Sequence, residues 1–295
     1  MSVLIIDADG DLWYTRQEEL GVDCIQMPYS YGGQEYYYDL GKNTDFKKFY
    51  SAVRGGEVPK TMALNPSEYV DILEKYFSKG EDVLYVSFSH AMSGTFDHLN
   101  TALNQLKEKY PKRKCTIFDT KAICLGAGIQ MEYAAELKNA GASDEEIIEK
   151  LTTFRDKVAM YFAVDDLMHL KRGGRLSGIA AFAGTLLSLK PILTLDEHGS
   201  LKVFEKITGK RKAIRKMADT VVRDLTGTDY SVYVLDADCP EEGDMLAEMI
   251  KEQRPDAKIV RQIVGPVIGS HCGPGTIGVI FVADQRPVPL AKDED

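Results

Sequence analysis

The sequence of 295 residues is long for a single hydrophobic core, since chains above about 250 residues tend to divide, and it therefore predicts two domains. A formal net charge of -9 argues against a protein that grips nucleic acid, so we expect no nucleic-acid partner. The five cysteines are scattered, without the spacing of a metal site or a redox pair, and suit reduced thiols. We expect no metal ligands and a cytoplasmic location.

The chain shows no signal segment, and no apolar run is long enough to span a bilayer. We therefore expect transient membrane contact at most.

The first half of the chain alternates strand patterns with helix patterns. Short apolar runs typical of buried strands lie at 3–7, 83–89 and 115–120. Apolar residues recur at helical spacing over 67–78, 95–110, 127–141 and 143–158. This alternation predicts a doubly wound parallel sheet in a Rossmann-like N-terminal α/β domain over residues 1–157.

In the second half, strands follow one another with fewer helices between them. A strand begins near Met160, and residues 191–207 predict a hairpin that turns at His198–Gly199. Further strands are predicted over 230–237, 258–268 and 276–283, and helices over 178–189, 211–226 and 241–253. We predict a C-terminal α+β domain with a mostly antiparallel sheet over residues 158–285, followed by a frayed tail over 286–295.

The stretch VLIIDADGD at residues 3–11 ends an apolar strand in closely spaced carboxylates. One interpretation is a phosphohydrolase of the haloacid-dehalogenase type, with Asp7 as nucleophile and Asp9 as general acid. The other is a strand end whose acidic residues form a turn and do no chemistry. These residues alone do not decide between the two interpretations.

A candidate anion site follows the second predicted strand. Ser93, Gly94 and Thr95 lie where a helix begins, and the amides at a helix N-terminus attract negative charge. The alternative is that Ser93 or Thr95 simply caps the helix, and capping and anion binding use the same amides.

Two glycine-rich segments of the second half are also candidates. LKRGGRLSG at 170–178 can present Arg172 or Arg175 to an anion, or can be a solvated turn. GPGTIG at 273–278 has the glycine spacing of a dinucleotide site, but a strand pattern follows it where a helix is needed. We interpret it as a tight turn that places His271.

A set of motifs recurs in order along nearly the whole chain, from about residue 2 to residue 283. They are IDADGDL at 6–12, TMALNP at 61–66, SHAMSGT at 89–95, FDT at 118–120, LKRGGR at 170–175, LKPIL at 189–193 and HCGPG at 271–275. Together they resemble the DegV family of bacterial fatty-acid-binding proteins, which includes the binding subunits of fatty acid kinase. The resemblance argues against the phosphohydrolase, the alternative that would use Asp7 and Asp9.

The resemblance implies a carrier rather than an enzyme, with no catalytic residue and with a lipid tunnel between the two domains. The carboxylate of a long-chain fatty acid would be held by the hydroxyls of Thr61 and Ser93 and by the amide of Gly94. The residues implied to line the tunnel or to flank the head group are Met62, Met92 and Thr95. The family has a serine and a glutamine where this chain has Met62 and Ala63, which leaves a changed acyl preference open.

The resemblance also implies a partner, the catalytic protein of a fatty acid kinase, which transfers phosphate from ATP to the bound carboxylate. Arg172, Arg175 and His271 match the positions that would present the head group to this kinase. The bound fatty acid is the only ligand implied, and no cofactor is expected.

Overall fold

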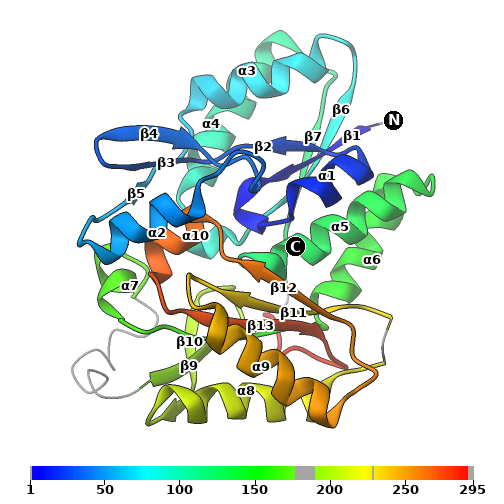
Figure 1. Ribbon diagram of the computed structural model, residues 1–295. Coiled ribbons are helices and arrows are strands. Elements are labelled where there is room, and N and C mark those ends of the chain that lie inside the picture. Colours follow the sequence, from blue (N-terminus) through cyan, green and yellow to red (C-terminus); the bar gives the residue numbers. More distant parts are fainter. Residues whose placement is uncertain (1, 177–189, 228, 292–295) are drawn as a thin grey trace. The chain divides into compact units, whose positions relative to one another are not determined.

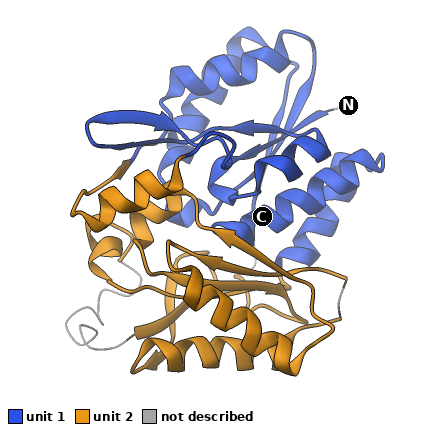
Figure 2. Ribbon diagram, viewed as in Figure 1, with its two compact units in different colours: residues 1–44, 61–155 blue, residues 45–60, 156–295 orange. Residues whose placement is uncertain are grey.

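The computed structural model describes residues 2–176, 190–227 and 229–291 (Figure 1). The chain forms two compact units, shown in separate colours in Figure 2. The first unit contains residues 1–44 and 61–155, and the second contains residues 45–60 and 156–295. The helix predicted over 178–189 lies outside the described residues.

A four-stranded parallel sheet forms the centre of the first unit (Figure 1). In the order β2-β1-β6-β7 its strands span Asp23–Ile25, Ser2–Asp7, Asp82–Ser87 and Cys115–Asp119. Val3 pairs with Val83 in parallel register. Nearly every residue of β1 and β6 is buried, as their continuous apolar sequences require, because helices cover both faces of the sheet. The predicted parallel α/β architecture is confirmed.

Five helices surround this sheet. They are α1 (Tyr14–Leu20), α3 (Pro66–Phe77), α4 (Thr95–Lys109), α5 (Leu125–Asn139) and α6 (Asp144–Arg155). Helices α3 and α4 pack against each other on one face, while α5 packs with α1 and α6 on the other (Figure 1). Asn65 and Glu68 form a reciprocal capping box at the start of α3, which fixes where this helix begins.

Thr61 lies in a small three-stranded sheet. The strands β3 (Pro28–Tyr31) and β4 (Gln34–Tyr37) form an antiparallel hairpin, and β5 (Lys60–Thr61) follows β3 in the strand order. The Met62 amide donates to the Pro28 carbonyl at 3.1 Å. This bond ties the chain that follows Thr61 to the hairpin.

The second unit is built on a six-stranded mixed sheet. In the order β10-β9-β8-β13-β11-β12, the strands span Leu201–Ile207, Lys190–Leu195, Val158–Ala163, Ile277–Val282, Val232–Asp236 and Ile259–Ile263. All neighbours are antiparallel except β11 and β12. The predicted hairpin is present as β9 and β10, and the mostly antiparallel sheet is confirmed.

Helices of the second unit complete its core. They are α2 (Phe46–Arg54), α7 (Met168–Arg172), α8 (Lys210–Asp224), α9 (Pro240–Gln253) and α10 (Pro266–Cys272). Helix α8 contributes Met217 and Val221 to the apolar core, which also contains Phe281 of β13.

Three local predictions differ from the structure. The strand predicted over 258–268 ends at Ile263, and Pro266 occupies the first turn of α10, where its missing N–H is not needed. The segment predicted as a loop from Leu170 begins inside α7. The tail predicted to fray from residue 286 begins with a buried Arg286, whose amide donates to the Asp156 carbonyl at 2.7 Å.

Candidate functional site

The turn that precedes α4 has the geometry of an anion site. Ser93 is extended, Gly94 is the N-cap of α4, and Thr95 is the first helical residue. The Thr95 amide donates to Ser93 Oγ at 3.3 Å, which leaves the single proton of the Ser93 hydroxyl to donate elsewhere. Open space surrounds the position where a side chain at Gly94 would stand, so a ligand atom can approach the backbone there.

The segment that carries Thr61 is attached to the same helix. Thr61 is half-buried, and the Met62 side chain is 36% exposed. Three residues further on, Leu64 is buried and its carbonyl accepts a hydrogen bond from His98 Nδ1 of α4 at 2.8 Å. The first unit therefore holds the Thr61 segment and the start of α4 on one scaffold.

The carboxylates that follow β1 are buried. Asp7 is 1% exposed, and its Oδ2 accepts from the Tyr85 hydroxyl at 2.8 Å and from the Phe88 amide at 3.0 Å. Burial raises the pKa of Asp7 to about 6, although hydrogen bonds from Phe88 and Tyr85 oppose this shift. This environment suits a structural carboxyl, since a nucleophile must reach its substrate.

The other two acidic residues stabilise the turn itself. Ala8–Gly10 form a single turn of 3-10 helix, and Asp11 ends it in the left-handed region with φ 52°. The Asp11 amide donates to the Ala8 carbonyl at 3.1 Å, and Cys124 Sγ lies 2.8 Å from Asp11 Oδ2. Asp9 is also buried. The turn is packed on α5 through Gly10 and Gly128, at a distance that excludes side chains.

The two glycine-rich motifs of the second unit lock together. A Cβ at Gly173 would overlap the imidazole of His271, and a Cβ at Gly273 would lie 2.5 Å from Cγ of His169. Gly173 thus accommodates His271, and Gly273 accommodates His169, which directly precedes the LKRGGR motif. His271 itself lies in the last turn of α10, and the turn predicted within GPGTIG follows it at Pro274–Gly275, directly before β13.

The two arginines of the LKRGGR motif have different surroundings. Arg172 is exposed at the end of α7, whereas Arg175 is half-buried and its Nη1 donates to the Gly173 carbonyl at 2.6 Å. Burial lowers the pKa of His271 to about 4, and the charge of Arg175 acts in the same direction. His271 is therefore neutral at physiological pH, and Arg175 supplies the positive charge beside it.

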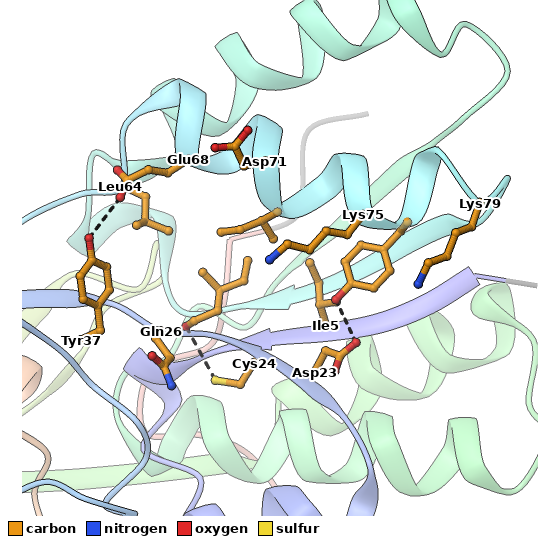
Figure 3. Close-up of a pocket in the computed structure, with 13 residues that line it drawn as sticks. Ile5, Asp23, Cys24, Gln26, Tyr37, Leu64, Glu68, Asp71, Lys75 and Lys79 are labelled. Atoms are coloured by element: carbon orange, nitrogen blue, oxygen red, sulfur yellow. Dashed lines mark hydrogen bonds between the residues drawn. The ribbon is translucent and has the colours of Figure 1, made fainter.

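A separate pocket of about 660 Å³ opens on the first unit between β2 and α3 (Figure 3). Its lining is mixed in charge, with Asp71 and Glu68 facing the same space as Lys75 and Lys79. None of the predicted site residues lines it. Five of its thirteen lining residues are charged, and an acyl chain bound there would separate them from water, which makes the pocket a poor site for an acyl chain.

Sequence reasoning did not single out Tyr69, Tyr85 or His98. Tyr69 contacts the Thr95 hydroxyl, Tyr85 donates to Asp7, and His98 contacts the carbonyl of Leu64, three residues after Thr61. Among the described residues no cluster of His, Cys, Asp and Glu is placed to hold a metal ion. Within the same ranges no helix is long and apolar enough to cross a membrane.

Comparison with known proteins gives full-length similarity. Residues 2–284 match the sequence model of the DegV family, which is described as a family of uncharacterised proteins. The DegV domain-containing protein CPE0026 of Clostridium perfringens is 35% identical over 285 residues, covering 96% of this chain and 98% of the relative. Protein DegV of Bacillus subtilis is 35% identical over 242 residues, covering 80% and 84%.

Solved structures give the same result. The crystal structure of DegV from Bacillus subtilis, described as a fatty acid binding protein, matches with a TM-score of 0.83 at 31% identity, covering 95% of this chain and 98% of that one. A DegV family protein from Thermus thermophilus, described by its fatty acid binding, matches with a TM-score of 0.82 at 28% identity, covering 95% and 99%.

Proposed function

Because the chain belongs to the DegV family, with a match to the family model over residues 2–284, we propose that it binds a long-chain fatty acid and presents it to a separate fatty acid kinase. The observation that carries this proposal is the turn at the start of α4, where the Ser93 hydroxyl and the open backbone at Gly94 form a place for a carboxylate. Solved relatives described as fatty acid binding proteins support it.

The carboxylate is proposed to accept hydrogen bonds from the hydroxyls of Ser93 and Thr61 and from the amide of Gly94. A carboxylate that leaves water must regain donors, and each hydrogen bond to a charged group contributes about 1.5–3 kcal/mol. The positive end of the α4 dipole adds to this attraction, because the helix is 15 residues long and its first turn faces the site.

The acyl tail is proposed to supply most of the affinity. Burial of each CH₂ contributes about 0.8 kcal/mol, so a chain of about 16 carbons gains on the order of 10 kcal/mol before ordering costs are subtracted. Met92, which is half-buried beside the turn, and Met62 are proposed to contact the tail or the head group. The tunnel itself stays a prediction.

The residues proposed to present the head group lie on the second unit. Arg172 is exposed and able to meet a partner protein, while the neutral imidazole of His271 is proposed to orient the acyl group toward the kinase without contributing to affinity. Arg175 is proposed to keep the local potential positive, which favours the anionic substrate of phosphoryl transfer. In this scheme the chemistry belongs to the kinase and this chain has no catalytic residue.

The proposal is tested by extracting the purified protein with organic solvent and identifying bound acids by mass spectrometry. Binding of palmitate and oleate to the delipidated protein is measured in parallel. The proposal is contradicted if the extract contains no acyl chains and the delipidated protein also fails to bind palmitate. Turnover of a generic phosphoester that disappears in Asp7→Asn would instead support the phosphohydrolase, which the burial of Asp7 disfavours.

Replacing Ser93 with alanine should weaken palmitate binding about tenfold, because the carboxylate loses one charged hydrogen bond. The dissociation constant is measured by titration calorimetry. Ser78→Ala is the matched control, since Ser78 is exposed at the end of α3 in the same unit and should leave affinity unchanged. Equal affinities of the two variants would remove Ser93 from the head-group site.

Arg172→Ala and His271→Ala should retain palmitate affinity but slow acyl phosphate formation at least about fivefold, because they act on presentation and not on binding. The rate is measured with a fatty acid kinase catalytic protein and ATP under conditions in which the unmodified protein is turned over. Lys171→Ala, an exposed neighbour on α7, is the control. Normal rates in both variants would mean that another surface presents the head group.

A further inference from the structure

One side chain of α4 is hydrogen-bonded to the segment that carries Thr61. His98 lies in the first turn of this helix, and its Nδ1 is 2.8 Å from the carbonyl oxygen of Leu64. A carbonyl oxygen can only accept, so the imidazole donates, and Nδ1 carries a proton whether the ring is neutral or charged. His98 is half-buried and Leu64 is buried, which limits the competition of water for this bond.

The bond at Leu64 closes a short span of chain that begins at Thr61. The residue after Thr61 is attached to the hairpin, because the Met62 amide donates to the Pro28 carbonyl at 3.1 Å. The side chains of Met62 and Ala63 are exposed, and that of Ala63 has no polar group, so they give this span little packing of their own. The bond from His98 therefore anchors the span to α4.

The other half of the proposed carboxylate site is attached to the same helix. Thr95 is the first residue of α4, and its amide donates to Ser93 Oγ at 3.3 Å. His98 follows Thr95 by three residues, and the backbone hydrogen bonds of a helical turn fix the geometry between such positions. The bond from His98 to Leu64 thus couples the position of Thr61 to that of Ser93.

We propose that His98 is a positioning residue for the carboxylate site, which holds Thr61 at a fixed position relative to Ser93. The inference rests on the proposed function, in which these two hydroxyls bind one carboxylate. A carboxylate has two oxygens at a fixed separation, so two donors bind it at full strength only when their own spacing is fixed. His98 does not contact the ligand in this scheme, and it acts through Leu64.

The first test compares replacements of His98 that differ in where they carry a donor. His98→Asn places an amide N–H near the position of Nδ1, His98→Gln places one near that of Nε2, and His98→Leu has none. Dissociation constants are measured for palmitate and for 1-hexadecanol, which has the same tail and no carboxylate. His98→Leu and His98→Gln should weaken palmitate binding about fivefold and leave 1-hexadecanol unchanged, whereas His98→Asn should stay within about twofold of the unmodified protein.

Thr101→Val is the matched control. Thr101 Oγ1 also donates from α4 to a backbone carbonyl, that of Asp97 at 2.8 Å, so this variant loses a bond of a similar kind on the same helix. Its binding of both ligands should be unchanged. If His98→Leu does not fold, His98→Gln carries the same comparison. Unchanged palmitate affinity in the variants without a donor at Nδ1, or equal losses for the acid and the alcohol, would overturn the inference.

A double-mutant cycle tests whether His98 acts on Thr61. Thr61→Val removes the hydroxyl and keeps the shape of the side chain, so the position of that hydroxyl no longer matters. The replacement of His98 by leucine should therefore weaken palmitate binding about fivefold on its own and less than about twofold when Thr61→Val is present. Losses that multiply would mean that His98 affects binding by another route, and would overturn the inference. Failure of the unmodified protein to bind palmitate would instead contradict the proposed function, and is observed before any variant is made.

Discussion

Replacing Gly128 with alanine is expected to lower the free energy of unfolding by about 2–3 kcal/mol, although alanine favours helices over glycine by about 1 kcal/mol. A Cβ at this position would overlap the carbonyl oxygen of Gly10 and lie 2.8 Å from Cδ2 of Leu125. The carbonyl belongs to the backbone of the turn that follows β1, so it moves only if the turn or α5 moves. Urea unfolding should show a lower midpoint with an unchanged slope.

Gly10→Ala is the matched comparison from the other side of this contact. A Cβ at Gly10 would meet mainly the thioether of Met131, including Cε at 2.9 Å, and the end of a methionine side chain can rotate away. The loss of stability should therefore be smaller than for Gly128→Ala. A Gly128→Ala protein as stable as the unmodified one would show that α5 is not in close contact with the turn.

The order and type of most elements of the sheets could be predicted from sequence. Continuous apolar runs such as 83–89 are buried on both faces in a parallel sheet, and a hairpin turn at His198–Gly199 joins two neighbouring strands. These signals are local, since they depend on a few consecutive residues. They therefore survive without knowledge of the tertiary contacts.

The placement of residues 45–60 depends on contacts distant in sequence. Helix α2 joins the second unit, where the buried Tyr50 hydroxyl donates to the Val264 carbonyl at 2.8 Å. Gly269 of α10 leaves room for the Tyr50 ring. No local pattern predicts a partner more than 200 residues away along the chain, because the same amphipathic helix would pack equally well elsewhere.

The candidate site was predicted unevenly for a related reason. Ser93 and Gly94 stand out because a strand, a small-residue turn and a helix follow one another in sequence. Tyr69 and Tyr85 do not, since an aromatic residue at a buried helix or strand position is usually part of the core. Only the structure shows that the Tyr69 hydroxyl lies 2.7 Å from the Thr95 hydroxyl and that the Tyr85 hydroxyl donates to Asp7 Oδ2.

The buried carboxyl at the end of β1 should make the protein less stable as the pH rises from 4 to 7. Burial raises the pKa of Asp7 to about 6 in the folded protein, above the usual 3.8 that applies when the chain is unfolded. Between these values the folded protein holds a proton that the unfolded chain has lost. Neutral Asp7 stabilises the folded protein fully when the pH is below 3.8, the pKa of this residue in the unfolded chain. This stabilisation, about 2–3 kcal/mol, is lost as the pH rises through about 6, its pKa in the folded protein.

Asp7→Asn isolates this contribution, because an amide has a similar shape and does not titrate. Between pH 4 and pH 7, the free energy of unfolding of Asp7→Asn should increase by about 2 kcal/mol relative to that of the unmodified protein. Any lost hydrogen bond adds an offset that does not depend on pH.

Asp39→Asn is the control with the opposite sign. Burial acts to raise the pKa of Asp39, but hydrogen bonds from Thr44 and Asn43 outweigh it and lower the pKa. Ionised Asp39 therefore stabilises the folded protein fully when the pH is above the pKa of this residue in the unfolded chain, and this stabilisation is lost only as the pH falls through the lowered pKa of the folded protein. The difference in unfolding free energy between Asp39→Asn and the unmodified protein should therefore stay constant between pH 5 and pH 7. A difference for Asp7→Asn that is also flat would mean that Asp7 ionises as readily in the folded protein as in the unfolded chain, and that burial does not control its charge.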